Sequence, residues 1–124
     1  MKGTVLVIEH DRAIADVIRV KLALDGWHLV ETLSAEEGLR VGQPAHPDLV
    51  IADIDLLGNG SEDFLGKWGV DRPPFLVVAR NNGGRLLRSL SEQPGVTVMA
   101  RPFRLCDLGE TVQQLVGHQR TRQD

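Results

Sequence analysis

Charged side chains that could hold a cation or an anion follow several apolar runs of this sequence. Glu9 and His10 come directly after the first run. Asp53 and Asp55 stand at the end of a central run, and Arg101 follows the last. Carboxylates that lie close together repel one another unless a cation or a proton comes between them. They suit a hard divalent ion such as Mg²⁺, and an arginine beside them would complete a site for an oxyanion or a phosphoryl group.

Short apolar runs rich in β-branched residues predict the strands that would position these groups. Such runs are typical of strands buried on both faces, as in a parallel sheet. We expect strands at Thr4–Ile8, at the weaker run Trp27–Val30, and at Leu49–Ala52, Phe75–Ala79 and Val96–Ala100.

Helical patterns lie between the first strands. Asp11 is a good N-cap for a first helix, which Gly26 would end. Ser34 and Glu37 form a capping-box pattern, which predicts a short second helix that ends near Gly42.

Three further helices are expected in the second half of the chain. Ser61 would open one of them, the stretch after the Asn81–Gly84 loop another, and the last is the clearest. Its apolar stripe consists of Leu105, Leu108, Val112, Leu115 and Val116. The β-α order, repeated five times with right-handed crossovers, predicts an open parallel sheet with helices on both faces. The working site of such a sheet lies beyond the carboxyl ends of its strands.

Composition sets the outer bounds of the function. The chain has 124 residues and a formal net charge of −3, which fits one domain that buries roughly two thirds of its unfolded surface. The mild acidity argues against broad binding to a nucleic-acid backbone. The single Cys106 excludes an internal disulfide, and no apolar stretch approaches the roughly 20 residues that span a bilayer. We expect a cytoplasmic protein that binds neither membranes nor, directly, nucleic acid.

Four stretches of the chain resemble, in order and at similar separations, the signature stretches of response-regulator receiver domains. They are Thr4–Asp11, Pro47–Asp53, Pro74–Arg80 and Arg101–Phe103. The resemblance covers the chain from Val5 to about Val116. It implies an α/β, flavodoxin-like (βα)5 fold with a doubly wound five-stranded parallel sheet in the order 2-1-3-4-5. Residues 1–124 would form a single receiver-like domain, with about 118–124 as a tail or the start of a linker.

The resemblance also implies roles for individual residues. Asp53 matches the aspartate that accepts a phosphoryl group from a histidine kinase. Glu9 and His10 match the acidic pair that holds Mg²⁺, and Asp55 is a weaker candidate ligand, through its backbone. Arg101, which precedes Pro102, matches a lysine before a cis proline that neutralises the phosphoryl charge.

Several positions depart from the family's pattern. Ala79 stands where a Ser or Thr would bind a phosphoryl oxygen, and Val98 where an aromatic switch residue is expected. Leu57 and Ser61 replace an expected proline and an expected glycine. His10 replaces a carboxylate, and imidazole suits Zn, Cu or Ni better than Mg²⁺. Mg²⁺ therefore remains an open cofactor prediction.

Alternative interpretations remain at these positions. Asp53 is either the acceptor or a surface aspartate that caps the turn Ile54–Gly60. His10 either faces solvent or belongs to an altered metal site, for which Asp11 could supply a carboxylate if it were not the N-cap. Arg101 either holds a phosphate or pairs with Asp53 or Glu9.

Other residues are weaker candidates for a functional role. The segment Gly58–Ser61 is either a flexible turn or an anion-binding loop. Arg80 could reach the same pocket as Arg101. Cys106 is expected to be a packing residue, and the basic residues His118, Arg120 and Arg122 are expected to lie in the tail.

The leading hypothesis is a signalling receiver module and not an enzyme. Its partner would be a sensor histidine kinase or a phosphotransfer protein, and phosphorylation of Asp53 would be weak or absent. The alternative is a phosphorylation-independent pseudo-receiver that acts in protein–protein interaction or dimerisation. A homodimer would use the face made by the fourth helix, fifth strand and fifth helix of the family, which includes Leu86–Leu90 and parts of Leu105–Val116. A third hypothesis is a small-anion-binding module that uses Gly58–Ser61.

Overall fold

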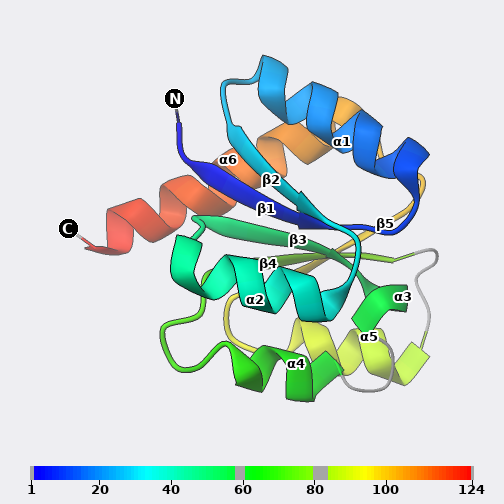
Figure 1. The fold of residues 1–124 in the computed structure, drawn as a ribbon, viewed down its shortest axis with the longest axis vertical. Helices are drawn as coiled ribbons and strands as arrows, with labels where there is room; N and C mark the ends of the chain where they lie inside the picture. The colour runs from blue at the N-terminus through cyan, green and yellow to red at the C-terminus, as the bar shows by residue number, and fades with distance from the viewer. Residues whose placement is uncertain (1, 58–60, 80–83, 124) are drawn as a thin grey trace.

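Five parallel strands form a single sheet at the centre of the molecule (Figure 1). The structure, a computed structural model, describes residues 2–57, 61–79 and 84–123. The sheet order is β2-β1-β3-β4-β5, which confirms the doubly wound flavodoxin-like prediction. The strands are β1 (Thr4–Ile8), β2 (His28–Thr32), β3 (Leu49–Asp53), β4 (Phe75–Ala79) and β5 (Val96–Ala100).

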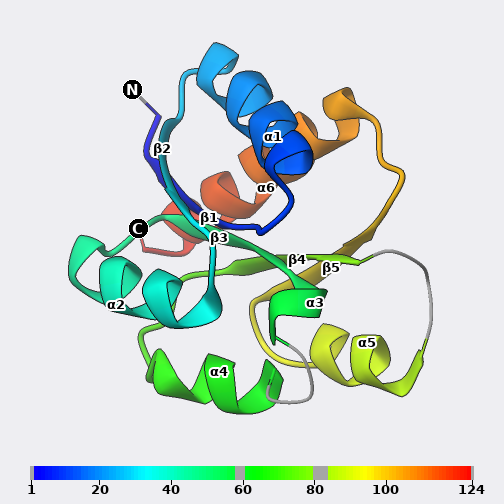
Figure 2. The ribbon, with the colours of Figure 1, turned by 45° about the vertical axis from the view of Figure 1, so that its right-hand side comes forward.

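Helices cover both faces of the sheet. Figures 1 and 2 show α1 and α6 on one face and α2, α4 and α5 on the other, while the short α3 lies beside the carboxyl end of β3. Their bounds are α1 (Arg12–Leu24), α2 (Ala35–Ala45), α3 (Ile54–Leu57), α4 (Ser61–Lys67), α5 (Gly84–Ser91) and α6 (Leu105–Gln123).

Two apolar clusters, one on each face, hold the layers together. The first joins β-strand residues such as Val7 and Ile51 to Ile18 and Leu22 of α1 and to Leu108 of α6. Along the three central strands nearly every residue is buried, as expected for parallel strands covered on both faces.

A second cluster fills the face under α2, α4 and α5. It includes Ile8 and Ala52 from the sheet, Trp68 after α4, and Leu90 from α5. The alternation of neighbouring strand residues between the two clusters follows the two-residue period of a strand. The strand-end residues 9 and 53 therefore emerge side by side, since β1 and β3 are neighbours in parallel register.

The element predictions hold with small shifts. β1, β4 and β5 match the apolar runs, β2 begins one residue later and extends to Thr32, and β3 includes Asp53. The capping predictions are confirmed, because Asp11 and Ser34 accept the first amides of α1 and α2. α2 passes Gly42 and ends at Ala45, where His46 adopts the left-handed conformation that stops it.

Two segments differ from the sequence predictions. Ile54–Leu57 forms the short helix α3 instead of a turn, because the Asp53 side chain accepts an amide at its start. α6 remains helical to Gln123, within the stretch expected to be a tail. Among the described residues, no helix is both long and apolar enough to cross a membrane.

Glycines bring α2 close to the sheet. A Cβ added to Gly38 would collide with the Ile8 side chain and lie 3.3 Å from Thr32 Oγ1. At Gly42 it would collide with the Trp68 ring and lie 2.7 Å from Leu6 Cδ2. Larger residues at these positions would push the helix away from β1.

Candidate functional site

Asp53 lies at the carboxyl end of the central strand β3, and only 1% of its surface is exposed. Its Oδ1 accepts a hydrogen bond of 2.9 Å from the backbone N–H of Asp55. The interpretation of Asp53 as a surface aspartate is therefore wrong, although the side chain does cap the turn that begins α3. β1 and β4 flank β3, so groups after these strands lie near Asp53.

Glu9 and His10 approach Asp53 from the end of β1. The Glu9 backbone N–H donates to the Thr32 carbonyl at 3.2 Å, and Glu9 is only 3% exposed. His10 has a side chain that is 46% exposed, with Nδ1 3.5 Å from Asp53 Oδ2. Each of the three residues offers one possible ligand atom, and these three atoms lie within 4.8 Å of one another. The structure thus brings together three of the four predicted metal ligands.

Arg101 reaches the same aspartate from the end of β5. Its backbone N–H donates to the Ala79 carbonyl at 2.7 Å, which extends the β4–β5 pairing by one bond. Its guanidinium Nη2 lies 3.6 Å from Asp53 Oδ2, and the side chain is 16% exposed. The peptide bond between Arg101 and Pro102 is cis, as the resemblance implies.

Burial shifts the protonation of Glu9. Loss of hydration raises the pKa of the Glu9 carboxyl from 4.5 to about 8, and the neighbouring Asp53 carboxylate acts in the same direction. The Arg101 charge and a backbone hydrogen bond from Asp11 oppose the shift. Below about pH 8, a proton therefore separates two carboxyl groups that would otherwise repel.

Several buried polar atoms of this cluster make no hydrogen bond within the part of the chain that the structure describes. They are Glu9 Oε1, Asp53 Oδ2, and Nε and Nη2 of Arg101. Buried atoms of this kind are costly to leave unpaired. The cluster therefore offers both acceptors and donors to an additional group.

Other predicted residues do not join the cluster through their side chains. Asp11 Oδ1 accepts the Ala13 and Ile14 amides at 3.0 and 3.4 Å, so Asp11 acts as the N-cap. Asp55 contributes its amide to Asp53, and its carboxylate is not in the three-residue group. Arg80 and Gly58–Gly60 lie outside the described residues. Cys106 is exposed, so its prediction as a packing residue is wrong.

Two residues that depart from the pattern of the resembled family, Ala79 and Val98, are apolar. Ala79 is buried at the end of β4 and offers no hydroxyl beside Asp53. Val98 packs against the apolar cluster under α5 and is only partly buried. Neither side chain can make the polar contacts of a hydroxyl group.

The donor set does not fit Mg²⁺. This ion prefers a near-octahedral shell of oxygen ligands, whereas one of the three donor atoms here belongs to the imidazole of His10. The Arg101 guanidinium also lies close to the Asp53 oxygen that the ion would need. A cation at that oxygen would have to compete with this fixed positive charge.

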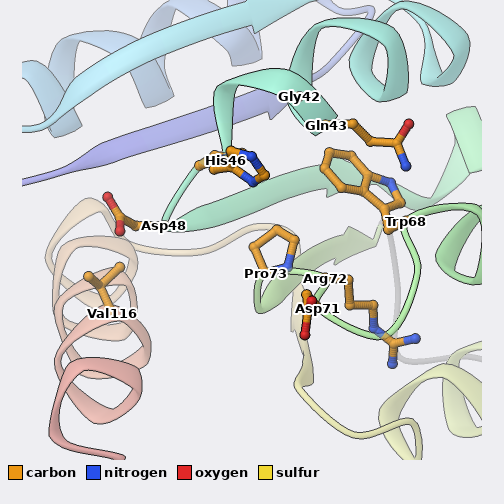
Figure 3. Close-up of a pocket in the computed structure, with 10 residues that line it drawn as sticks. Gly42, Gln43, His46, Asp48, Trp68, Asp71, Arg72, Pro73 and Val116 are labelled. Atoms are coloured by element: carbon orange, nitrogen blue, oxygen red, sulfur yellow. The ribbon is translucent and has the colours of Figure 1, made fainter. Parts of the chain in front are cut away.

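A cavity of about 410 Å³ lies at the opposite, amino edge of the sheet, and Figure 3 shows its lining. Two of its polar side chains bind the backbone: Asp48 Oδ2 accepts the Thr4 amide at 2.8 Å, and Gln43 Nε2 donates to the Lys67 carbonyl at 2.8 Å. No sequence pattern indicates this cavity, since its residues come from three separate stretches of the chain, 42–48, 68–73 and 116. They are Gly42, Gln43, His46, Pro47, Asp48, Trp68, Asp71, Arg72, Pro73 and Val116.

Comparison with known proteins supports the assignment of the fold. No protein-family model matches the chain. A response regulator receiver domain protein from Methanospirillum hungatei JF-1 superimposes with a TM-score of 0.81 at 23% identity, over 96% of this chain and 97% of that one. The molecule thus has the receiver-domain fold.

Two curated proteins are similar to the chain in sequence. The transcriptional regulatory protein YcbL of Bacillus subtilis is 26% identical over 90% of this chain and 50% of its own length. The transcriptional regulatory protein AfsQ1 of Streptomyces coelicolor is 29% identical over 64% of this chain and 36% of its own length. The chain thus spans half or less of these relatives. The chain is thus similar in fold to a response regulator receiver domain and in sequence to part of two transcriptional regulatory proteins.

Proposed function

We propose that Asp53 accepts a phosphoryl group from a phosphohistidine of a sensor kinase or phosphotransfer protein. The observation that carries this proposal is the buried Asp53 Oδ2, which has no hydrogen bond and lies 3.6 Å from the Arg101 guanidinium. A carboxylate oxygen that accepts no hydrogen bond can act as a nucleophile, and the neighbouring cation can stabilise the charge of the incoming group. The proposed interaction between this domain and its phosphoryl donor takes place in the cytoplasm.

The transfer step follows from these positions. Asp53 Oδ2 attacks the phosphorus atom, so an O–P bond forms while the P–N bond of the phosphohistidine breaks. The electron pair of that bond stays on the donor's imidazole nitrogen. Nε and Nη2 of Arg101, which form no hydrogen bond within the described residues, can donate to the phosphoryl oxygens in the two-pronged manner of a guanidinium.

Ala79 makes the expected reaction slow. A hydroxyl at this position would donate to a charged oxygen, an interaction worth about 1.5–3 kcal/mol. Its absence corresponds to a rate that is lower by roughly ten- to a hundredfold. We therefore expect weak phosphorylation compared with a receiver that has a Ser or Thr here.

The test is the intact mass of the protein after incubation with a small phosphoryl donor. The native chain is expected to gain the mass of one phosphoryl group, and Asp53→Asn to gain none. Asp48→Asn is the matched control, because Asp48 lies at the opposite edge of the sheet, and it should react like the native chain. No gain in the native protein, or an equal gain in Asp53→Asn, would contradict the proposal.

The second candidate is a pseudo-receiver that works through its surface alone. The proximity of Arg101 to Asp53 favours it, since the guanidinium already balances the aspartate charge. Dimerisation through α5, β5 and α6 remains a prediction of this kind. Leu90, Leu108 and Val112 are buried inside the domain, while Leu105 is exposed, so a second copy would have to contact residues such as Leu105.

A further inference from the structure

The three-residue group Glu9, His10 and Asp53 has the chemistry of a metal site different from the one that the family resemblance implies. Glu9 and His10 follow β1, and Asp53 ends the adjacent strand β3. Two carboxyl groups and one imidazole each offer an atom, and these atoms lie within 4.8 Å of one another. One ion could therefore contact all three after small side-chain adjustments.

Two buried oxygens that form no hydrogen bond point independently to a ligand at this place. Glu9 and Asp53 are both more than nine-tenths buried, and Glu9 Oε1 and Asp53 Oδ2 make no hydrogen bond within the described chain. Leaving such a group unpaired costs about 1–3 kcal/mol or more. An ion that displaces the Glu9 proton and binds both oxygens would remove this cost.

The imidazole decides which ion is favoured. The positive charge of Arg101 disfavours every divalent cation at Asp53 Oδ2 to a similar extent, because the repulsion depends on charge and distance. A bond to the His10 nitrogen offsets that repulsion only for ions that bind imidazole strongly. These are transition metals such as Zn²⁺, Cu²⁺ and Ni²⁺, whereas Mg²⁺ prefers oxygen.

We infer that Glu9, His10 and Asp53 form a binding site for a divalent transition-metal ion, selective for Zn²⁺ over Mg²⁺. Each residue supplies one ligand, and the half-exposed His10 leaves a path for the ion to enter. Three protein ligands with a remaining position for water are a common zinc arrangement. The inference does not depend on phosphoryl transfer.

Calorimetric titration of the full chain with ZnCl₂ and with MgCl₂, in the absence of any phosphoryl donor, tests the site. We expect a single equivalent of Zn²⁺ to bind at least about tenfold more tightly than Mg²⁺. His10→Ala should weaken Zn²⁺ binding at least about tenfold, since even the loss of partners behind a ligand costs about 10- to 100-fold. His28→Ala is the matched control, because His28 lies at the start of the edge strand β2, and it should bind like the native chain.

A second variant tests selectivity directly. His10→Asp restores an oxygen-only set, so it should bind Mg²⁺ more tightly and Zn²⁺ less tightly than the native chain. Circular dichroism checks that each variant is folded. Equal Zn²⁺ affinity in His10→Ala and native protein would place the ion at another histidine or at Cys106 and overturn the inference. Mg²⁺ binding as tight as Zn²⁺ binding in the native chain would overturn it as well.

Discussion

The two edges of the sheet differ in how their polar groups are satisfied. At the amino edge, Asp48, Gln43 and Arg72 each contact a backbone partner at 2.8 Å. At the carboxyl edge, Asp53 Oδ2 lies 3.5 Å from His10 and 3.6 Å from Arg101, too far for a good hydrogen bond. Both edges contain acidic and basic side chains, yet among the described residues only the carboxyl edge buries atoms of ionisable groups that form no hydrogen bond.

This difference marks the carboxyl edge as the candidate functional edge and the amino edge as a structural one. Polar side chains that bind the backbone fix the chain that enters the strands, so they contribute to stability. Buried charged groups without partners cost stability, and proteins retain them mainly where they bind or react. Trp68 Nε1 at the amino edge also lacks a partner in the described residues, but the indole is uncharged and its ring packs in the core.

The largest expected effect is at the structural edge. Trp68→Ala removes a buried ring that meets Phe64 and Phe75 edge-on at 6.1 and 5.4 Å. We expect the free energy of unfolding to fall by about 3–5 kcal/mol, as measured by denaturant titration. Zn²⁺ binding by the folded variant should be unchanged. A large loss of metal binding would show that the two edges are not independent.

A substitution at the functional edge should change reactivity instead. Ala79→Ser supplies the missing hydroxyl, which we expect to raise the rate of phosphorylation by roughly ten- to a hundredfold. The measurement is the time course of intact mass with a small phosphoryl donor. Ala100→Ser is the control, because Ala100 pairs with Ala79 but lies one strand farther from Asp53. Equal acceleration by both serines would contradict a specific role for position 79.

The protonation of Glu9 makes the smallest of the three effects, and it depends on pH. The folded chain holds the Glu9 proton up to about pH 8, whereas the carboxyl of the unfolded chain loses it near 4.5. The folded state therefore binds more protons between these values, and this contribution to stability is lost as pH rises. Between pH 6 and 7 the loss should be at most roughly 1.4 kcal/mol.

Glu9→Gln isolates this effect, since the amide does not titrate in this range. Unfolding by denaturant at several pH values, with a chelator present, should show a shallower fall in stability for the variant than for the native chain. Parallel pH profiles of the two proteins would show that the Glu9 carboxyl is not protonated in the fold.

The fold could be predicted from the sequence because local and global signals agree. The apolar runs at Thr4–Ile8 and Phe75–Ala79 mark strands to the residue, and Asp11 and Ser34 mark helix starts through capping bonds that depend on near neighbours. α3 was missed because its first turn depends on a bond from the Asp53 side chain, whose direction is set by the tertiary structure.

The site was predicted in part. Strand order brings Glu9, His10, Asp53 and Arg101 to one edge, as the resemblance implied. The sequence could not show which atoms remain without hydrogen bonds, because that depends on distances of a few tenths of an ångström. The contribution of Thr32, whose carbonyl holds the Glu9 amide, also had no local signal.

The contact of Gly38 with β1 links the acidity of the site to a helix that carries none of its ligands. Gly38 lies against Ile8 and Thr32, the residue before Glu9 and the residue whose carbonyl binds the Glu9 amide. Because burial is the main cause of the raised Glu9 pKa, a shift of the β1 backbone that carries Glu9 would change that pKa. A methyl group added at Gly38 of α2 would thus change the proton affinity of the Glu9 carboxyl from a distance, through the backbone of β1.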